Sequence, residues 1–368
     1  MNKEILTNER LGEQYIRVVH PSGLTILLCP MPDFATTYAL FGTNYGSVDN
    51  CFKTDPEAEF IKLPDGIAHF LEHKLFESED GDAFSLFAET GASANAYTSF
   101  DKTCYLFSCT DAFIPSLKAL LTFVQAPYFT QQTVEKEQGI IGQEIRMYED
   151  SPGWQVTFQL LEALYHDNPV KVDIAGTVES IAQIDADLLY RCYHTFYNLS
   201  NMVLSIAGKF DPDEALAVIE ENLKPAEPKP IFFPPYTEPT EPVTSFAQRE
   251  MDVSMPLFQL GFKIPPEEEP AAFLRQQYEL EMLHELLAGT TSSFYEEMLR
   301  RGIINVNFCS EVFAGRGFLT SMFGGESEDP AALQQALLAR IQEVREKGLD
   351  PADFQCAKNA MYGRMVRG

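Results

Sequence analysis

A proline-rich segment near the middle of the chain divides the sequence into two parts. Seven of the twenty residues at 224–243 are proline. Proline lacks a backbone donor and disfavours helix, so this segment predicts an extended connection between domains. A chain of 368 residues is also long enough for two domains. We therefore predict an N-terminal domain at 1–224, a linker at 225–242 and a C-terminal domain at 243–368.

The same order of predicted elements occurs on both sides of this linker. β-branched and aromatic residues favour strands, and longer segments with helical periodicity favour helices. Before the linker, the predicted elements are strands at 16–29 and 36–48, helices at 65–76 and 82–90, strands at 92–98 and 103–108, and helices at 111–125 and 131–148, followed by further helices, a strand at 202–206 and a helix at 211–222. After it, they are strands at 243–253 and 257–264, helices at 271–288 and 292–301, strands at 304–313 and 317–323, and helices at 330–346 and from 351 onward.

This repeat predicts an α+β fold of two structurally homologous domains, each a mostly antiparallel sheet packed with helices. The second copy ends within a helical pattern, AKNAMYGRMVRG, that has no stop signal. We expect this C-terminal domain to be truncated, without its last helices and one strand.

Composition limits the partners and the compartment. With 54 acidic and 27 basic residues, the formal net charge of -27 would repel nucleic acid and anionic membranes. The N-terminus has no basic start followed by an apolar run, and no 18-residue apolar segment follows, so we expect neither a signal peptide nor a membrane span. Seven cysteines without C-x-x-C spacing fit reduced thiols in a cytoplasm better than a disulfide framework.

The segment GIAHFLEHK at 66–74 predicts a metal-binding helix, with Asp65 as its N-cap. At about 100° per residue, His73 lies about 40° from His69 around the helix, and Glu72 lies about 60° away on the other side. Two imidazoles one turn apart can bind one zinc ion, and a carboxylate beside them can accept a proton from bound water. The alternative of two unrelated histidines is weaker, because the chain contains only six histidines.

A catalytic zinc needs a third protein ligand, and the segment TVEKEQGIIGQEIRMY offers two carboxylates. Glu137 and Glu144 are seven residues apart, so they share one helix face, with Ile140 and Ile141 between them. Acidic side chains on an apolar stripe indicate a cation beneath them. A half-exposed helix with two solvated glutamates is an equal alternative on spacing alone.

The chain resembles the pitrilysin/insulinase family of zinc peptidases over nearly its whole length. The segments that carry the resemblance are HFLEH, GASANAYTSFDKTCYLF and EKEQGIIGQEIRMYED, within residues 64–150. In detail they are similar to bacterial two-domain members encoded in adjacent pairs, one of which has been linked to aminopentanol modification of elongation factor P.

This resemblance implies a processing-peptidase-like metallohydrolase fold and one bound Zn²⁺. It implies that His69, His73 and Glu144 are the zinc ligands, that Glu72 is the general base and that Glu137 is a supporting carboxylate.

The resemblance also implies that the strand through Asn95 and Ala96 binds the backbone of a peptide substrate as an added β-strand. Without the resemblance, the sequence predicts only that Asn95 is a polar residue on an ordinary strand.

The second domain departs from the pattern of active members of the family. Those members place an arginine and a tyrosine there to polarise the substrate carbonyl. Here EEMLRRGIINVNF supplies Arg300 or Arg301 but no tyrosine. His284 in LEMLHELL stands outside any H-x-x-E-H motif, so we expect a core or helix-surface role for it and one metal site per chain.

We expect a zinc-dependent endopeptidase that works within a dimer, with a homologous subunit completing the site as a homodimer or heterodimer. The main alternative is a non-cleaving binding or scaffold subunit of a peptidase pair. A zinc lyase with an inverted motif is a weaker alternative, because such lyases are single small domains and this chain contains a repeat.

Overall fold

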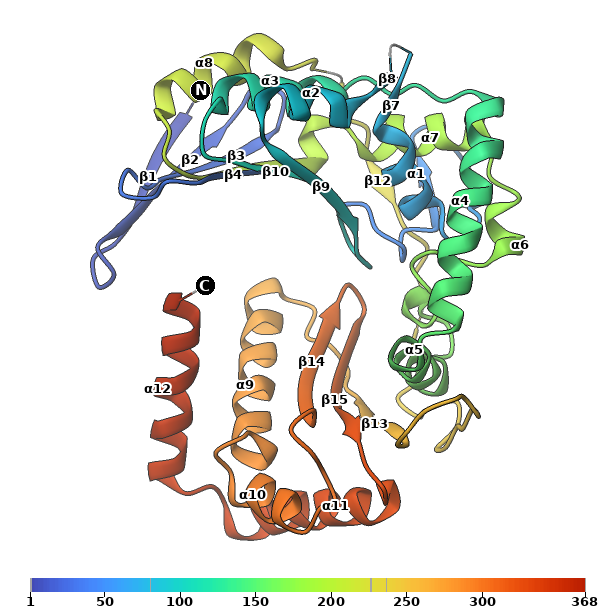
Figure 1. Ribbon diagram of the computed structural model, residues 1–368, viewed down its shortest axis with the longest axis vertical. Helices are drawn as coiled ribbons and strands as arrows, with labels where there is room; N and C mark the ends of the chain where they lie inside the picture. Colours follow the sequence, from blue (N-terminus) through green and yellow to red (C-terminus); the bar gives the residue numbers. More distant parts are fainter. Residues whose placement is uncertain (1, 80, 226, 236, 368) are drawn as a thin grey trace. The chain divides into compact units, whose positions relative to one another are not determined.

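The computed structural model describes residues 2–79, 81–225, 227–235 and 237–367, which form two compact units (Figure 1). Unit 1 contains the chain up to Arg146 together with Val172–Pro235, and unit 2 contains Met147–Lys171 together with the chain from residue 237 onward. Residues 147–171 therefore lie outside the unit to which the sequence assigned them. The reason is that helix α5 (Pro152–Leu164) packs on strand β13 (Leu257–Lys263), where its leucine side chains lie directly over Gly261.

A seven-stranded sheet forms the centre of unit 1. In spatial order its strands are β1 (Asn2–Asn8), β2 (Glu13–Val19), β3 (Thr25–Pro30), β11 (Met202–Gly208), β4 (Thr37–Thr43), β10 (Thr103–Cys109) and β9 (Ser93–Thr98). Neighbouring strands are antiparallel, except that β11 runs parallel to β3. Every second residue of β11 is buried, as expected of a strand with one face on the core.

Two features of this sheet differ from the sequence prediction. The single strand predicted at 16–29 is the hairpin β2–β3, because a turn at Gly23, with φ 89° and its N–H bonded to His20 O, separates the two. Strand β1 was missed, because its sequence NKEILTN has too few apolar residues to show an alternating pattern. It is held by pairing along its whole length with β2.

Helices cover one face of the sheet. Figure 1 shows α2, α3 and α8 lying along this face, with α1 beyond β9. The helices of unit 1 are α1 (Ile67–Leu75), α2 (Ala83–Thr90), α3 (Phe113–Val124), α4 (Gln131–Glu149) up to Arg146, α6 (Val178–Ile181), α7 (Ala186–Phe196) and α8 (Pro212–Asn222). Short strands β5 (Cys51–Thr54), β6 (Ile61–Lys62) and β12 (Ile231–Phe232) form a second sheet, and β7 (Glu77–Ser78) pairs with β8 (Gly81–Asp82).

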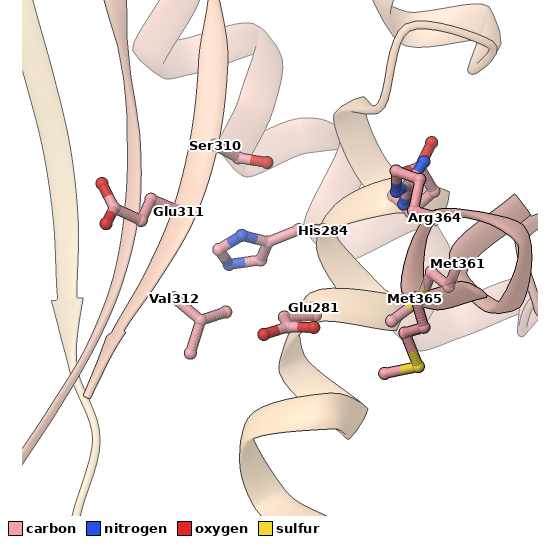
Figure 2. Close-up of a pocket in the computed structure, with 9 residues that line it drawn as sticks. Glu281, His284, Ser310, Glu311, Val312, Met361, Arg364 and Met365 are labelled. Carbon is pink, nitrogen blue, oxygen red and sulfur yellow. The ribbon is translucent and has the colours of Figure 1, made fainter. Parts of the chain in front are cut away.

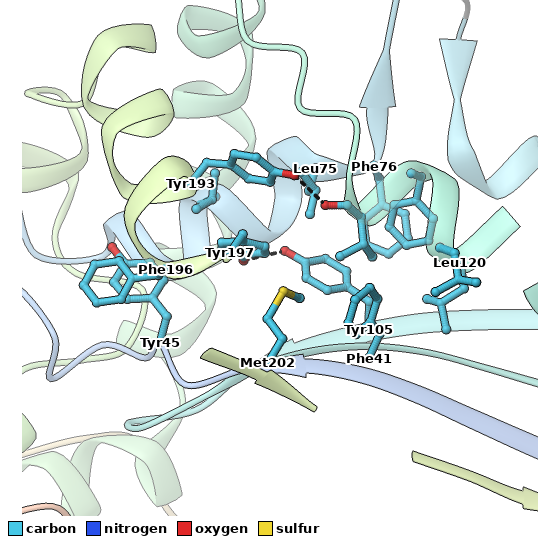
Figure 3. Packing of buried hydrophobic residues seen from close by; sticks show 14 of the residues in the cluster. Phe41, Tyr45, Leu75, Phe76, Tyr105, Leu120, Tyr193, Phe196, Tyr197 and Met202 are labelled. Carbon is cyan, nitrogen blue, oxygen red and sulfur yellow. Dashed lines mark hydrogen bonds between the residues drawn. The ribbon is translucent and has the colours of Figure 1, made fainter. Parts of the chain in front are cut away.

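The core between helices and sheet is rich in aromatic rings (Figure 3). Tyr105 is fully buried, and its hydroxyl forms a hydrogen bond with the Tyr197 hydroxyl at 2.9 Å. This bond matters because a buried hydroxyl without a partner destabilises the fold. Leu75 and Phe76, at the end of α1, belong to the same cluster. Burial of each large apolar side chain contributes about 1.5–3 kcal/mol, so the core anchors the end of α1.

Unit 2 has a smaller antiparallel sheet, in the order β13, β15 (Phe318–Glu326) and β14 (Cys309–Gly315). Its helices are α5, α9 (Pro270–Ala288), α10 (Ser293–Arg300), α11 (Pro330–Lys347) and α12 (Pro351–Arg367). The order β13, α9, α10, β14, β15, α11, α12 repeats the order β4, α1, α2, β9, β10, α3, α4 of unit 1. The predicted α+β repeat is therefore present.

Two predicted strands of this unit need correction. Residues 243–253 form no strand, because they are mostly exposed and no neighbouring strand pairs with them. The strand predicted at 304–313 starts only at Cys309, because the preceding residues form a turn in which Phe308 N–H bonds to Asn305 O at 3.2 Å.

Two further features concern the described chain as a whole. Within the described ranges, no helix is long and apolar enough to cross a membrane. All seven cysteines are free thiols, and Cys104 and Cys109 are buried.

The start of α1 is fixed by a close contact between two chain segments, each of which has a glycine at the point of contact. Gly66 has φ 90°, and a Cβ atom there would lie 2.3 Å from the Ala175 carbonyl oxygen. Gly176 has φ 73°, and a Cβ atom there would lie 2.4 Å from the Asp65 carbonyl oxygen. The prediction that Asp65 is the N-cap of α1 is wrong. Its side chain instead accepts a hydrogen bond from Asn50 at 2.7 Å, and Gly66 takes the cap position without a side-chain bond.

We predict that Gly66→Ala lowers the free energy of unfolding by about 2–5 kcal/mol, from left-handed strain plus steric overlap. Urea unfolding followed by circular dichroism measures this change. Gly91→Ala is the matched control, because Gly91 also has a positive φ of 70° but nothing within 4 Å of the added carbon. It should cost only about 1–2 kcal/mol. Equal losses in the two variants would contradict the role given to the close approach.

Candidate metal centre

Helices α1 and α4 bring three potential metal ligands together in unit 1. His69 and His73 lie one turn apart on α1, and their ring centroids are 4.6 Å apart. His69 Nε2 lies 3.7 Å from Glu144 Oε1, and His73 Nε2 lies 3.5 Å from Glu144 Oε2. In the part of the chain that the structure describes, this is the one group of three or more histidine, cysteine or acidic residues placed to hold a metal.

The spacing of these atoms fits a shared zinc ion. Zinc bonds of about 2.0–2.2 Å in a tetrahedron place ligand atoms roughly 3.3–3.6 Å apart. The two histidine–glutamate separations, 3.5 and 3.7 Å, lie close to this range and are too long for strong hydrogen bonds. A set of two imidazoles and one carboxylate is also the set that catalytic zinc takes in several peptidases.

Burial keeps the first histidine in its metal-binding form. Burial, and then the neighbouring His73, lower the pKa of His69 to about 3. Its ring is therefore neutral near pH 7 and offers a lone pair without losing a proton. Its Nδ1 atom is buried and has no hydrogen-bond partner among the described residues, so no second bond fixes the orientation of this ring.

The second histidine, in contrast, is oriented by a buried carboxylate. Glu137 is 6 % exposed, and its Oε1 lies 3.0 Å from His73 Nδ1. Burial by itself lowers the pKa of His73, but the Glu137 hydrogen bond and nearby carboxylates outweigh it and raise the pKa. With Nδ1–H donating to Glu137, Nε2 faces Glu144 as a ligand should. Of the two isoleucines expected on this face, Ile141 is buried, whereas Ile140 is 47 % exposed.

Glu72 lies buried beside this group. Its Oε2 accepts a hydrogen bond from the Thr98 hydroxyl at 2.8 Å. Burial raises the pKa of Glu72, and the Thr98 bond opposes that rise. Sequence analysis missed Thr98, because nothing in the sequence indicates that the end of β9 lies against α1.

Strand β9 presents an open edge next to the site. Among the described residues it pairs with β10 on one side only. Asn95 is exposed, and its side-chain oxygen accepts the backbone N–H of Ala96 at 2.9 Å. An open edge can accept a further strand. The substrate-binding role of Asn95 and Ala96 stays a prediction.

The corresponding place in unit 2 has different chemistry. A cavity of about 360 Å³ lies between α9, β14 and α12, which correspond in order to α1, β9 and α4 (Figure 2). His284 is 4 % exposed there, and its Nε2 lies 2.5 Å from the Ser321 hydroxyl, so of the two predicted roles, core or helix surface, the structure shows the core role. Arg364 of α12 forms an ion pair with Glu285 of α9 at 2.8 Å. Arg301 forms an exposed ion pair with Glu297, and a catalytic role for Arg300 or Arg301 stays a prediction.

Comparison with known protein families and curated proteins gives consistent matches. Residues 62–178 match the family described as insulinase (peptidase family M16), and residues 183–361 match the peptidase M16 inactive domain. The zinc protease YmfH of Bacillus subtilis, itself uncharacterised, is 42% identical over 342 residues, covering 92% of this chain and 80% of that protein. The uncharacterised zinc protease YmxG of the same organism is 26% identical, covering 82% of this chain and 74% of that one.

Solved structures support the same fold. An M16-like peptidase from Alicyclobacillus acidocaldarius matches with a TM-score of 0.92 at 39% identity, covering 100% of this chain and 85% of that one. Pitrilysin matches with a TM-score of 0.71 at 15% identity, covering 96% of this chain and 39% of that one, which bears on the fold alone. The predicted α+β fold, with an N-terminal peptidase domain and an inactive C-terminal domain, is confirmed.

We predict a graded loss of zinc affinity along α4. Glu144→Ala should weaken zinc binding by more than about 100-fold because a ligand is lost, and Glu137→Ala by about 10–100-fold because His73 loses its orientation. Competition with a chromophoric chelator measures both affinities. Glu135→Ala, an exposed position on the same helix, should leave the affinity unchanged. A Glu144 variant that binds zinc like the wild type would contradict the ligand set.

Proposed function

Because this chain belongs to the insulinase family of peptidases, family M16, we propose that it is a zinc-dependent endopeptidase whose metal is held by His69, His73 and Glu144. The observation that carries this proposal is the approach of both histidine Nε2 atoms to the two oxygens of one glutamate, at 3.7 and 3.5 Å. Two imidazoles and one carboxylate at this spacing form a ligand set that catalytic zinc takes in several peptidases.

The remaining chemistry is assigned to the chain's own residues. A bound zinc ion supplies a Lewis acid that polarises the scissile carbonyl and lowers the pKa of the attacking water. Glu72 accepts the proton of that water and returns it to the leaving amine. Its buried position strengthens it as a proton acceptor, and the hydrogen bond from Thr98 holds one carboxylate oxygen so that the other can face the water. Glu137 keeps His73 Nε2 directed at the metal.

We place the peptide substrate along the open edge of β9. There Asn95 and Ala96 would bind its backbone as an added strand, with specificity left to side-chain pockets. This edge is attractive because the same strand ends at Thr98, which contacts the general base. Substrate binding and proton transfer would then depend on one strand.

We further propose that a homologous subunit completes the active site, in a homodimer or heterodimer in the cytoplasm. The supporting observation is that the segment after Arg300 and Arg301 contains no tyrosine. The same feature favours the alternative function, a non-cleaving subunit that binds peptide or scaffolds a cleaving partner. Membership of an adjacent encoded pair, and the link to elongation factor P, remain predictions.

We predict that Glu72→Gln keeps zinc but loses at least about 100-fold in turnover, since a general base typically contributes 10²–10⁴-fold. Zinc content and cleavage of a fluorogenic peptide library should be measured with and without the homologous neighbour. The matched control is Glu89→Gln, on the exposed face of α2, which should leave turnover unchanged.

Two results would decide against parts of this proposal. A zinc-loaded Glu72→Gln variant with wild-type turnover would refute the role of Glu72. A wild-type protein that binds zinc but cleaves no library peptide, alone or with its neighbour, would favour the scaffold function.

We predict that Asn95→Ala raises KM about fivefold to tenfold with little change in kcat, because one backbone-directed hydrogen bond contributes roughly 1–1.5 kcal/mol. Steady-state kinetics on the best library peptide provide the measurement. Ser93→Ala changes an exposed position on the same face of β9 and should leave KM unchanged. A fall in kcat without a change in KM would argue against a substrate-binding strand.

A further inference from the structure

The residue that follows the ligand His73 is a lysine with no role in the chemistry above. Lys74 is 0 % exposed, although it lies in the last turn of α1. Lysine is almost never fully buried unless it is paired. A buried ammonium group one residue from a metal ligand therefore needs a compensating partner, and that partner affects the local geometry.

Glu77 is that partner. The Lys74 ammonium donates to Glu77 Oε2, and the other oxygen, Glu77 Oε1, lies 3.8 Å from Lys136 Nζ. Glu77 lies on β7, immediately after α1, and Lys136 lies on α4. The Lys74–Glu77–Lys136 chain thus joins the residue after His73 to the residue before Glu137.

These three charged residues lie beside the His73–Glu137 hydrogen bond, which orients the potential ligand His73. His73 and Glu137 form a direct bond between α1 and α4 at 3.0 Å, and the three charged residues form a second connection one residue away on each helix. The two halves of this connection are unequal. Lys136 is 69 % exposed, so its ion pair is screened by solvent and contributes little. In the Lys74–Glu77 half, Lys74 is fully buried and Glu77 is 25 % exposed, so this ion pair is screened much less.

We propose that Glu77 is a positioning residue for the metal centre. By neutralising the buried Lys74, it keeps the last turn of α1 closed and holds the His73 ring in line with Glu137 and Glu144. Without the Glu77 carboxylate, the Lys74 ammonium group is a buried charge without a partner, which is unfavourable. If the Lys74 side chain then moves to reach solvent, it distorts the turn that carries His73. This inference rests on the proposed metal site, and it makes Glu77 a residue that determines how tightly that site binds zinc.

The test is a double-mutant cycle read out as zinc affinity, by chelator competition on the full chain. Glu77→Gln should weaken zinc binding about tenfold or more, in the range of outer-sphere substitutions. Adding Lys74→Met removes the buried charge, so the double variant should return to within about threefold of wild type. Glu79→Gln, an exposed glutamate two residues away with the same change of charge, should bind like the wild type.

Cobalt(II) absorption provides a second readout, because its intensity reports ligand geometry. The Glu77→Gln spectrum should change, and the double variant should regain the wild-type spectrum. Wild-type affinity in Glu77→Gln, or a double variant as weak as Glu77→Gln, would overturn the positioning role. Neither readout uses turnover. A protein that binds zinc but cleaves no peptide would therefore count against the proposed peptidase function, while the zinc affinities and cobalt spectra of the variants would still test the role of Glu77.

Discussion

The contact between α1 and α4 decides whether unit 1 has a metal site at all. Two of the potential ligands come from one helix and the third from another, so each ångström of separation between the helices changes the fit to an ion. The buried bond between His73 and Glu137, at 3.0 Å, fixes that separation at one height. The aromatic core that holds Leu75 and Phe76 and the close glycine contact at Gly66 fix the two ends of α1. The short helix is thereby constrained at its start and at its last turn.

The acidic groups around the site explain why it suits a cation. Glu72, Glu137 and Glu144 lie near one another with two neutral or weakly basic imidazoles between them. Burial works against this concentration of negative charge, as the raised pKa of Glu72 records. A divalent ion offsets the repulsion directly, and its binding adds to the stability of the fold as its free concentration rises above Kd.

Helical periodicity was enough to predict that His69, Glu72 and His73 share one face, and that Glu137 and Glu144 share another. Spacing could not show which glutamate is closer to the histidine Nε2 atoms. The answer depends on where along α4 the helix α1 crosses it. The family resemblance, and not the spacing, was the reason to choose Glu144 over Glu137 as the ligand. The hydrogen bond from Thr98 and the burial of Lys74 could not be predicted either. Both depend on which strand and which turn lie against α1, and a lysine at a helix end ordinarily reads as solvated.

The errors in the fold prediction have a similar cause. Residues 243–253 have strand-like composition but no neighbour to pair with, whereas β1 has unremarkable composition and is held by β2. In both segments tertiary pairing outweighed local preference. The inactive half of the chain was easier to identify, because the absence of a second H-x-x-E-H motif is visible in the sequence itself.

The ion pair of Arg364 with Glu285 has a consequence for how the two halves of the repeat respond to their surroundings. Where α1 and α4 bring together a group that could hold a metal, the corresponding helices α9 and α12 are joined by an ion pair whose arginine is 60 % exposed. A pair this exposed is screened by solvent and contributes little, so the stability of unit 2 rests on its apolar core. Among the described residues unit 2 has no group that could hold a metal, so a metal bound between α1 and α4 would add its binding free energy to unit 1 and leave unit 2 without that contribution.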